Sequence, residues 1–205
     1  LRGIPFIYQG QEIGMTNCRR NDISEYDDIS TKDQYREALA AGCSRNQALE
    51  CCYENSRDNA RTPMQWSAGN GAGFTDGTPW LALNPNYTQI NVEEQAERPD
   101  SVLSYYKKLL ALKKSPEYKE AFTYGRFIPD HEDQEGIFAY HRKTDEQDIL
   151  VAANYGTGPC TLKMDNASAK VLLSNVGTED IRAREIAETG AVTLESCEAL
   201  VLLLG

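Results

Sequence analysis

The pattern of apolar and polar positions changes near residue 118. Before that point, short helical patterns alternate with long polar loops, and after it, short apolar runs are separated by turn residues. Apolar residues spaced three and four apart predict helices, whereas short apolar runs bounded by turns are typical of β structure. The pattern therefore predicts a mixed region at 1–117 and a separate β-rich domain at 118–205.

The mixed region begins with an apolar run that predicts a buried strand at 4–8. Helices are expected at 32–41, 45–55 and 102–114. Ser44 and Gln47 can form a capping box for the second helix, because each side chain satisfies a free backbone N–H of the other residue.

Two further helix starts are marked by polar residues. Asn91 is the expected start of a short helix, and Asp100 is the expected N-cap of the long helix after it. The stretch at 56–90 is rich in Gly and Pro and predicts a long loop. A loop of this length inside a compact domain usually has a functional reason.

The second region predicts strands with almost no helix between them. Such a series suggests a small antiparallel β-sandwich. The expected strands lie near 122–128, 136–142, 148–154, 159–164, 169–174, 191–194 and 198–204.

Charge and composition narrow the classes of partner. The 205 residues include 21 Lys and Arg against 31 Asp and Glu, which gives a formal net charge of −10. Nucleic-acid binding needs a basic face that displaces counterions, so this class is excluded, and an anionic membrane surface is disfavoured. No apolar run approaches the ~20 residues that span a bilayer. A neutral polar partner such as a sugar fits the composition.

The six cysteines form no Cys-x-x-Cys pair, and neither His131 nor His141 completes a zinc spacing. We expect free thiols, a reducing cytoplasmic location, and no metal or other cofactor. Asp27-Asp28 predicts a solvated turn rather than a calcium site, because no further oxygen ligands recur at loop spacing. The two histidines lie in the β-rich region and are not expected to be catalytic.

One segment, 56–66, gathers side chains that suit carbohydrate recognition. It contains Arg57, Asp58, Arg61 and Trp66. Guanidinium groups donate paired hydrogen bonds to hydroxyls, and flat aromatic faces pack on sugar C–H groups. The alternative is an Arg–Asp ion pair that pins a loop, with Trp66 in a core. The residues alone leave both interpretations open.

Glu12 follows the predicted first strand and also has two interpretations. It is either a catalytic carboxylate or a residue that ties down a loop through backbone N–H groups. Nothing in its neighbourhood decides between them.

Several blocks occur together in one order and spacing over about the first 115 residues. In that order they resemble the end of the catalytic barrel in the α-amylase superfamily. More narrowly, they resemble the group of oligo-1,6-glucosidases, α-glucosidases, dextran glucosidases and sucrose isomerases. The blocks are Gly-Ile-Pro-Phe-Ile-Tyr-Gln-Gly-Gln-Glu-Ile-Gly-Met-Thr-Asn at 3–17, the segment 56–66, Ala-Gly-Phe-Thr at 72–75, Pro-Trp at 79–80, and Asn-Pro-Asn-Tyr at 84–87 with Ile-Asn at 90–91.

The resemblance implies a chain of α/β plus all-β class. Residues 1–117 would be the C-terminal end of a (β/α)8 TIM barrel, and residues 118–205 would be an antiparallel β-sandwich domain. Residues 4–8 would then be barrel strand eight. The loop after that strand lies at the face where active sites are built in such barrels.

The resemblance also implies substrate-binding roles for two arginines. Arg61 would contact the non-reducing-end glucose, and Arg57 would lie nearer the leaving group. The chain departs from the family pattern at two places near the site: Ser30 ends an Asp-Ile-Ser segment where relatives often have Glu, and Gln11 stands where many have Glu.

No catalytic residue is assigned within the chain. Retaining glycosidases use two carboxyl groups about 5–5.5 Å apart, and in this family the three catalytic carboxylates precede strand eight, the last within Asn-His-Asp. That motif is absent, so we expect all three upstream of Leu1, and Glu12 does not replace them. The chain is then expected to be a fragment, inactive alone, whose partner is the missing N-terminal barrel segment.

The resemblance implies that the parent enzyme hydrolyses terminal α-linked glucose from isomaltose- or maltose-like oligosaccharides. Two alternatives remain. One is a sucrose isomerase or glucosyltransferase of the same family. The other is a non-catalytic relative such as the heavy-chain ectodomain of an amino-acid transporter.

Overall fold

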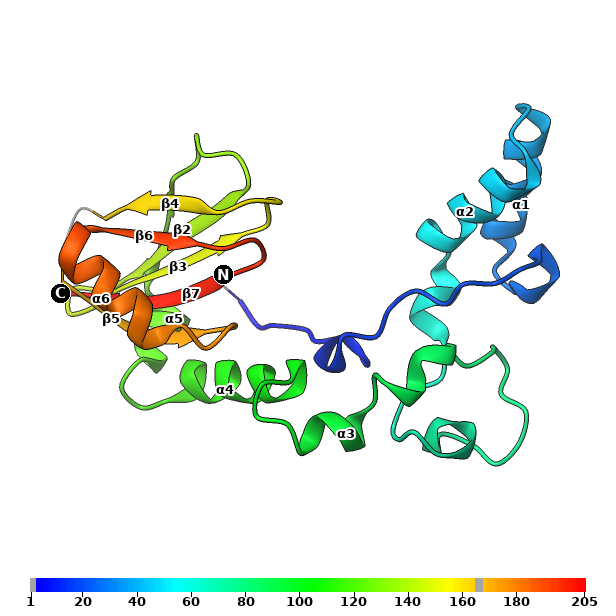
Figure 1. The fold of residues 1–205 in the computed structure, drawn as a ribbon, viewed down its shortest axis with the longest axis horizontal. Helices are drawn as coiled ribbons and strands as arrows, with labels where there is room; N and C mark the ends of the chain where they lie inside the picture. Colours follow the sequence, from blue (N-terminus) through cyan, green and yellow to red (C-terminus); the bar gives the residue numbers. More distant parts are fainter. Residues whose placement is uncertain (1–2, 165–167) are drawn as a thin grey trace. The chain divides into compact units, whose positions relative to one another are not determined.

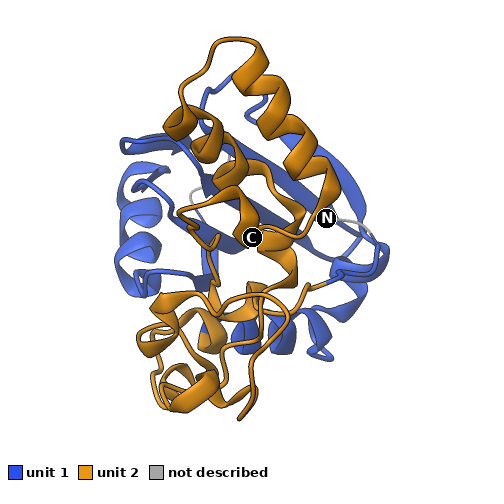
Figure 2. Ribbon diagram, turned by 90° about the vertical axis from the view of Figure 1, so that its right-hand side faces the viewer, with its two compact units in different colours: residues 1–6, 105–205 blue, residues 7–104 orange. Residues whose placement is uncertain are grey.

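The computed structural model describes residues 3–164 and 168–205. Contacts divide the chain into two compact units, coloured separately in Figure 2. One unit, called the loop unit below, contains residues 7–104. The other, called the sheet unit, contains residues 105–205 and the residues before Ile7. The predicted domain boundary after residue 117 is a different division and stays a prediction.

The loop unit consists of short helices and long connections (Figure 1). The predicted helices at 32–41 and 45–55 are present, and the predicted loop at 56–90 contains three short 3-10 helices. The helices of the loop unit that precede α4 (Val102–Lys114) are η1 (Gln11–Ile13), η2 (Ile23–Glu25), α1 (Ile29–Ala40), α2 (Arg45–Asn55), η3 (Arg57–Arg61), η4 (Asn70–Gly73), η5 (Pro85–Thr88) and α3 (Val92–Ala96).

Helices α1 and α2 pack as a pair around a small core. The capping box of Ser44 and Gln47 is confirmed at the start of α2. Helix α1 begins three residues before the expected start, because the side chain of Asp28 accepts the N–H of Thr31 and caps the helix there. The buried members of the core are Tyr26, Tyr35, Ala48 and Cys52.

Two predictions for the first region are wrong. Residues 4–8 form no strand, and Ile4 and Phe6 are 81% and 92% exposed. A strand needs a hydrogen-bonded neighbour, and no strand in the described residues pairs with this segment. The long helix α4 (Val102–Lys114) is capped by Ser101 rather than Asp100, because the Ser101 hydroxyl accepts the N–H of Ser104 at 3.1 Å.

The sheet unit contains two antiparallel sheets. The larger has the strand order β1-β2-β3-β7-β5, and the smaller pairs β4 with β6. The elements after α4 are α5 (Lys119–Tyr124), β1 (Arg126–Asp130), β2 (Ile137–Lys143), β3 (Asp148–Asn154), β4 (Cys160–Lys163), β5 (Ala169–Ser174), α6 (Glu179–Thr189), β6 (Ala191–Leu194) and β7 (Ala199–Leu204).

The larger sheet has an apolar cluster on each face. On one face, β2, β3 and β7 pack on β4, β6 and α6 around Leu150, Leu162 and Ile186. On the other face, Ile149 and Val201 pack on α4 and α5. Alternation along β3 explains both clusters, because successive side chains of a strand point to opposite faces.

None of the helices in the described residues is long and apolar enough to cross a membrane.

Sequence patterning located six of the seven expected strands to within one residue at either end. The expected strand at 122–128 is wrong in its first half, because residues 119–124 form α5 and Gly125 ends that helix before β1. Helix α6 was not expected. The apolar pattern of α6 is weak, because its buried positions are Arg182 and Ile186 and many of the residues around them are charged.

Candidate functional site

The site is built around η3, which carries both predicted arginines. Its first turn is fixed by Ser56, whose hydroxyl accepts the N–H of Asp58 at 3.1 Å. Arg57 and Arg61 are the first and last residues of this short 3-10 helix. Both guanidinium groups reach the same carboxylate oxygen: Asp28 Oδ1 lies 2.5 Å from Arg57 Nη2 and 3.5 Å from Arg61 Nη1. The structure therefore brings the two residues together.

Asp28 is buried, which corrects the expectation of a solvated turn. Its second oxygen, Oδ2, accepts hydrogen bonds from the N–H and the hydroxyl of Thr31 at 3.2 and 2.9 Å. The hydrogen bond from Arg57 is the largest cause that lowers the pKa of Asp28, to about 2, and the bonds from Thr31 add to it against the effect of burial. Asp28 is thus a charged partner for both arginines.

Asp58 is a second buried carboxylate at the same place, and its side chain is fully shielded from solvent. Its Oδ2 accepts the backbone N–H groups of Asp27 and Asp28 at 2.7 and 3.0 Å. Its Oδ1 lies 3.2 Å from Arg61 Nη1. The predicted Arg–Asp ion pair that pins a loop is therefore present, and it coexists with exposed guanidinium groups.

Burial is divided unequally within this cluster. The side chains of Asp28 and Asp58 are 4% and 0% exposed, whereas those of Arg57 and Arg61 are 64% and 37% exposed. A guanidinium group has five N–H donors, and these contacts occupy only part of them. The arrangement can therefore hold two cations in place and still offer donors to a ligand.

Two tryptophans accompany the arginines, and sequence reasoning singled out only Trp66. Trp66 is 50% exposed, so the alternative that placed it in a core is wrong. Trp80 is 68% exposed, and its indole N–H donates to Asp27 Oδ2 at 2.9 Å. This bond sets the orientation of an open aromatic face beside the Asp28 segment. The Pro-Trp block was a signal for Trp80, but Trp80 and Asp27 stand 53 positions apart in the sequence, and this separation hid their contact.

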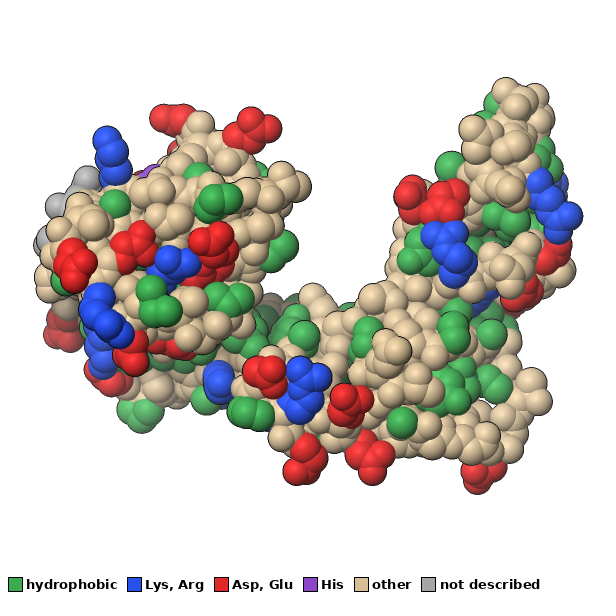
Figure 3. All heavy atoms as spheres, viewed as in Figure 1, with side chains coloured by type: hydrophobic (Ala, Val, Ile, Leu, Met, Phe, Trp, Pro, Cys, Tyr) green, Lys and Arg blue, Asp and Glu red, His purple; other side chains and the backbone are tan. Residues whose placement is uncertain are grey.

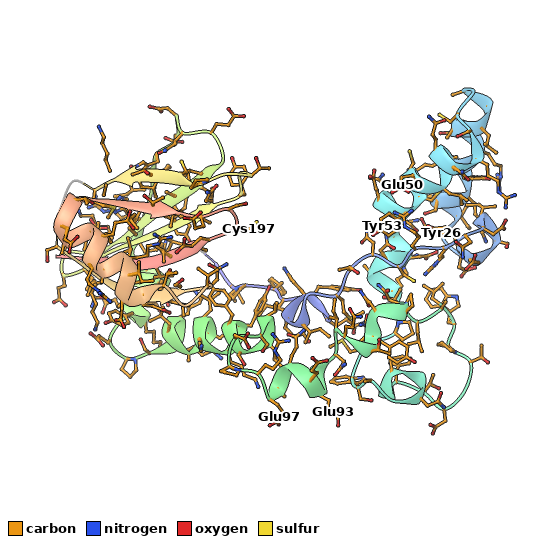
Figure 4. All side chains as sticks on the ribbon, viewed as in Figure 1. Tyr26, Glu50, Tyr53, Glu93, Glu97 and Cys197 are labelled. Atoms are coloured by element: carbon orange, nitrogen blue, oxygen red, sulfur yellow. The ribbon has the colours of Figure 1, made fainter. Side chains whose placement is uncertain are left out.

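Two arginines brace the segment that leads to Asp27 and Asp28. Arg19 pairs with Glu50 at 2.5 Å, and its guanidinium carbon lies 3.9 Å from the ring centre of Tyr53. Figure 4 labels Glu50 and Tyr53 on α2 and Tyr26 on the neighbouring segment. Arg20 is buried 4.9 Å from the ring centre of Tyr26. Burial raises the pKa of the Tyr26 hydroxyl to about 12.

A cavity of about 290 Å³ lies beside η3 within the loop unit. Ser56, Asn59 and Thr62 line it, whereas Arg57 and Arg61 do not. The two sides of the η3 segment thus have different surroundings. One side faces the cavity, and the other carries the arginines and contacts the Asp27–Asp28 segment. The cavity is not formed by the predicted substrate-binding side chains.

The remaining candidates in the loop unit are less engaged. Glu12 lies in η1, and its buried Oε2 has no hydrogen-bond partner among the described residues, so that oxygen does not tie down a loop. Gln11 accepts the N–H of Tyr8 at 3.2 Å. Ser30 is exposed in the first turn of α1, two residues from Asp28.

Both histidines lie in the sheet unit. His141 stands between two carboxylates, with Nδ1 at 2.7 Å from Asp148 and Nε2 at 3.2 Å from Asp130. Burial raises the pKa of Asp148, but the hydrogen bonds from Lys143 and His141 outweigh it and give a net lowering. Over residues 3–164 and 168–205, no three His, Cys, Asp or Glu side chains are grouped so as to hold a metal ion. That the histidines are not catalytic stays a prediction.

Comparison with known proteins identifies the family. A sequence model of the alpha-amylase catalytic domain matches residues 1–125, more than half of the chain. The chain belongs to the alpha-amylase catalytic-domain family. The predicted resemblance to this superfamily and to its oligo-1,6-glucosidase group is confirmed.

Curated relatives of this alpha-amylase family chain include bacterial glucosidases. The chain is 41% identical over 186 residues to the probable oligo-1,6-glucosidase 2 of Bacillus subtilis (strain 168), covering 88% of the chain and 33% of the relative. It is 39% identical over 209 residues to the oligo-1,6-glucosidase of Bacillus cereus, covering 100% of the chain and 36% of the relative. The chain therefore spans about a third of the length of these relatives.

Solved structures of the family agree in fold. The trehalose-6-phosphate hydrolase of Bacillus licheniformis superposes with a TM-score of 0.88 at 34% identity, covering 100% of this chain and 36% of that one. The isomaltulose synthase of Erwinia rhapontici NX5, crystallised as a mutant with D-glucose, superposes with a TM-score of 0.81 at 33% identity, covering 98% and 35%.

Proposed function

We propose that this chain is the C-terminal part of a retaining α-glucosidase of the oligo-1,6-glucosidase type. The complete protein would remove terminal α-linked glucose from isomaltose- or maltose-like oligosaccharides. The observation that supports this most directly is the pair of exposed guanidinium groups held by buried carboxylates, in a chain similar to oligo-1,6-glucosidases.

In this proposal the chain supplies the end of a (β/α)8 barrel and a β-sandwich, and the catalytic carboxylates lie in the rest of the protein. Arg61 binds the non-reducing-end glucose and Arg57 lies toward the leaving group. A neutral polar substrate fits the acidic composition, which disfavours nucleic acids and anionic membrane surfaces as partners. On the face drawn in Figure 3, acidic and basic side chains are interspersed. A cytoplasmic location is part of the proposal and is supported by the six free thiols.

The test is Arg61→Ala in the complete protein, assayed with nitrophenyl-α-glucoside and isomaltose. We expect kcat/KM to fall by the equivalent of about 2–5 kcal/mol, because a charged donor to the sugar is lost and the buried carboxylate of Asp58 loses its guanidinium partner. Arg36→Ala is the matched control, since Arg36 forms an exposed ion pair with Asp33 at the same spacing as Arg61 and Asp58. An unchanged kcat/KM for Arg61→Ala rejects the assigned role. The isolated 205 residues are expected to show no turnover.

A sucrose isomerase or glucosyltransferase is the second candidate, and its support is the similarity to isomaltulose synthase. Such an enzyme passes the glucosyl group to a sugar hydroxyl instead of water. Product analysis of the complete protein on sucrose separates the two activities: glucose and fructose indicate hydrolysis, whereas isomaltulose indicates isomerisation.

A further inference from the structure

Asp58 contacts three groups of the site through two oxygens with separate tasks. Oδ1 accepts from the guanidinium of Arg61, and Oδ2 accepts only backbone N–H groups, those of Asp27 and Asp28. The residue is fully buried, so it is placed to hold other groups rather than to meet a ligand.

The backbone contacts extend the influence of Asp58 beyond Arg61. Fixing the peptide groups of Asp27 and Asp28 fixes where their side chains start. The Asp28 carboxylate then accepts from Arg57, and the Asp27 carboxylate accepts from the indole of Trp80. One buried carboxylate is thereby linked, directly or through one residue, to two guanidinium groups and one aromatic face.

We propose that Asp58 is a positioning residue that holds Arg61, Arg57 and Trp80 in one arrangement for sugar recognition. This inference rests on the proposed function, because it concerns how the same site is organised. A guanidinium that is already held by a buried carboxylate loses less rotamer freedom when it binds a hydroxyl pair. The exposed Trp80 adds a flat apolar surface of the kind that packs against sugar C–H groups.

Asp58→Asn separates the two tasks of the carboxylate. The amide oxygen of Asn can replace Oδ2 and still accept the two backbone N–H groups. Its NH2 group then faces the guanidinium of Arg61, where two donors meet and no hydrogen bond forms. The substitution therefore releases Arg61 while the Asp27–Asp28 segment keeps its anchor.

The experiment measures kcat and KM of the complete protein for nitrophenyl-α-glucoside, with the thermal midpoint measured in parallel. We expect Asp58→Asn to lower kcat/KM about 10- to 100-fold, with a rise in KM, because a charge-assisted contact of the binding site is lost. Asp33→Asn is the control, since it removes a carboxylate from an exposed Asp–Arg pair of the same spacing. It is expected to leave both constants unchanged.

A double-variant cycle distinguishes positioning from a general structural defect. If Asp58 acts through Arg61, the variant carrying both Asp58→Asn and Arg61→Ala loses no more activity than Arg61→Ala alone. Additive losses overturn the proposal. Should Asp58→Asn fail to fold, Ser56→Ala provides a milder route, because it removes a hydroxyl that accepts the N–H of Asp58 and also the hydroxyl of Thr31, and leaves the Asp58 carboxylate in place. A loss of a few fold that vanishes in the Arg61→Ala background is then expected.

The outcomes also separate this inference from the proposed function. Full activity of Asp58→Asn together with a loss in Arg61→Ala rejects positioning and leaves the proposed function intact. Full activity of Arg61→Ala rejects positioning and the role assigned to Arg61, whereas absence of α-glucosidase activity in the unaltered complete protein rejects the proposed function.

Discussion

The two units each contain a buried carboxylate paired with arginine, but they expose the arginine to different degrees. In the sheet unit, Glu198 is 0% exposed and its partner Arg182 is 10% exposed. In the loop unit, Asp58 is likewise 0% exposed, whereas Arg61 is 37% exposed and Arg57, on Asp28, is 64% exposed. The chemical pair is similar, and the solvent access of the cation differs.

The Glu198–Arg182 pair, called the closed pair below, takes all its hydrogen bonds to the carboxylate from groups of the protein itself. Arg182 donates to Glu198 twice, at 3.0 and 2.6 Å, and Thr178 and the N–H of Glu195 donate to the same carboxylate. Burial raises the pKa of Glu198, but the hydrogen bonds from Arg182 and Thr178 outweigh it and give a net lowering. A closed pair of this kind joins α6 to the start of β7. In the loop unit, the guanidinium groups of the Asp58–Arg61 and Asp28–Arg57 pairs instead keep N–H donors free for a ligand.

The largest expected effect follows from breaking the closed pair with Glu198→Gln. Removing one partner of a buried ion pair costs about 3–5 kcal/mol, and the loss here should lie toward the lower end of that range because Glu185 still pairs with Arg182 at 3.0 Å. We expect that loss of stability in the sheet unit, measured in the complete protein by amide hydrogen exchange in β7 and α6.

The matched control is Glu188→Gln, which alters an exposed carboxylate on α6 and is expected to change exchange little. Unaltered protection of β7 in Glu198→Gln would show that the closed pair is not structural.

An intermediate effect is expected from Arg57→Ala in the complete protein. Arg57 is mostly exposed and pairs with one carboxylate, so its loss should lower kcat/KM by only a few fold. The effect should be larger for isomaltose than for a nitrophenyl glucoside if the residue lies toward the leaving group. A loss equal to that of Arg61→Ala for both substrates contradicts the division of roles between the two arginines.

Sequence patterning predicted the sheet unit well because the apolar runs and turns that mark its strands are local signals. Short apolar runs placed β2, β3 and β7 directly, and the turn residues between them supplied their ends. The segment at 4–8 failed for the opposite reason. Its apolar residues fit a strand, but strand formation depends on a pairing partner that a local pattern cannot reveal.

The candidate site was predictable only in part. Arg57 and Arg61 came from one short block, and the Asp58–Arg61 pair lies within a single turn. Asp28 and Trp80 could not be linked to that block, because 29 residues separate Asp28 from Arg57 and the turn before α1 appeared solvated from its composition. Contacts between distant loops depend on tertiary packing.

The smallest expected effect is a change in how folding stability depends on acidic pH, and it tests whether Asp28 and Arg57 behave as an ion pair. The hydrogen bond from Arg57, together with those from Thr31, lowers the pKa of Asp28 to about 2 from its ordinary value of 3.8. Because the folded value lies below the unfolded one, the stabilisation is complete above about pH 4 and is lost as the pH falls toward about 2.

Asp28→Asn removes the charge but retains the cap of α1, since Asn caps as well as Asp. In the complete protein, urea unfolding of this variant should depend less steeply on pH between about 4 and 2 than that of the unaltered protein. Added salt should shrink the difference, because Arg57 is exposed. Identical slopes in the two proteins would mean that the Asp28–Arg57 contact does not contribute to folding stability.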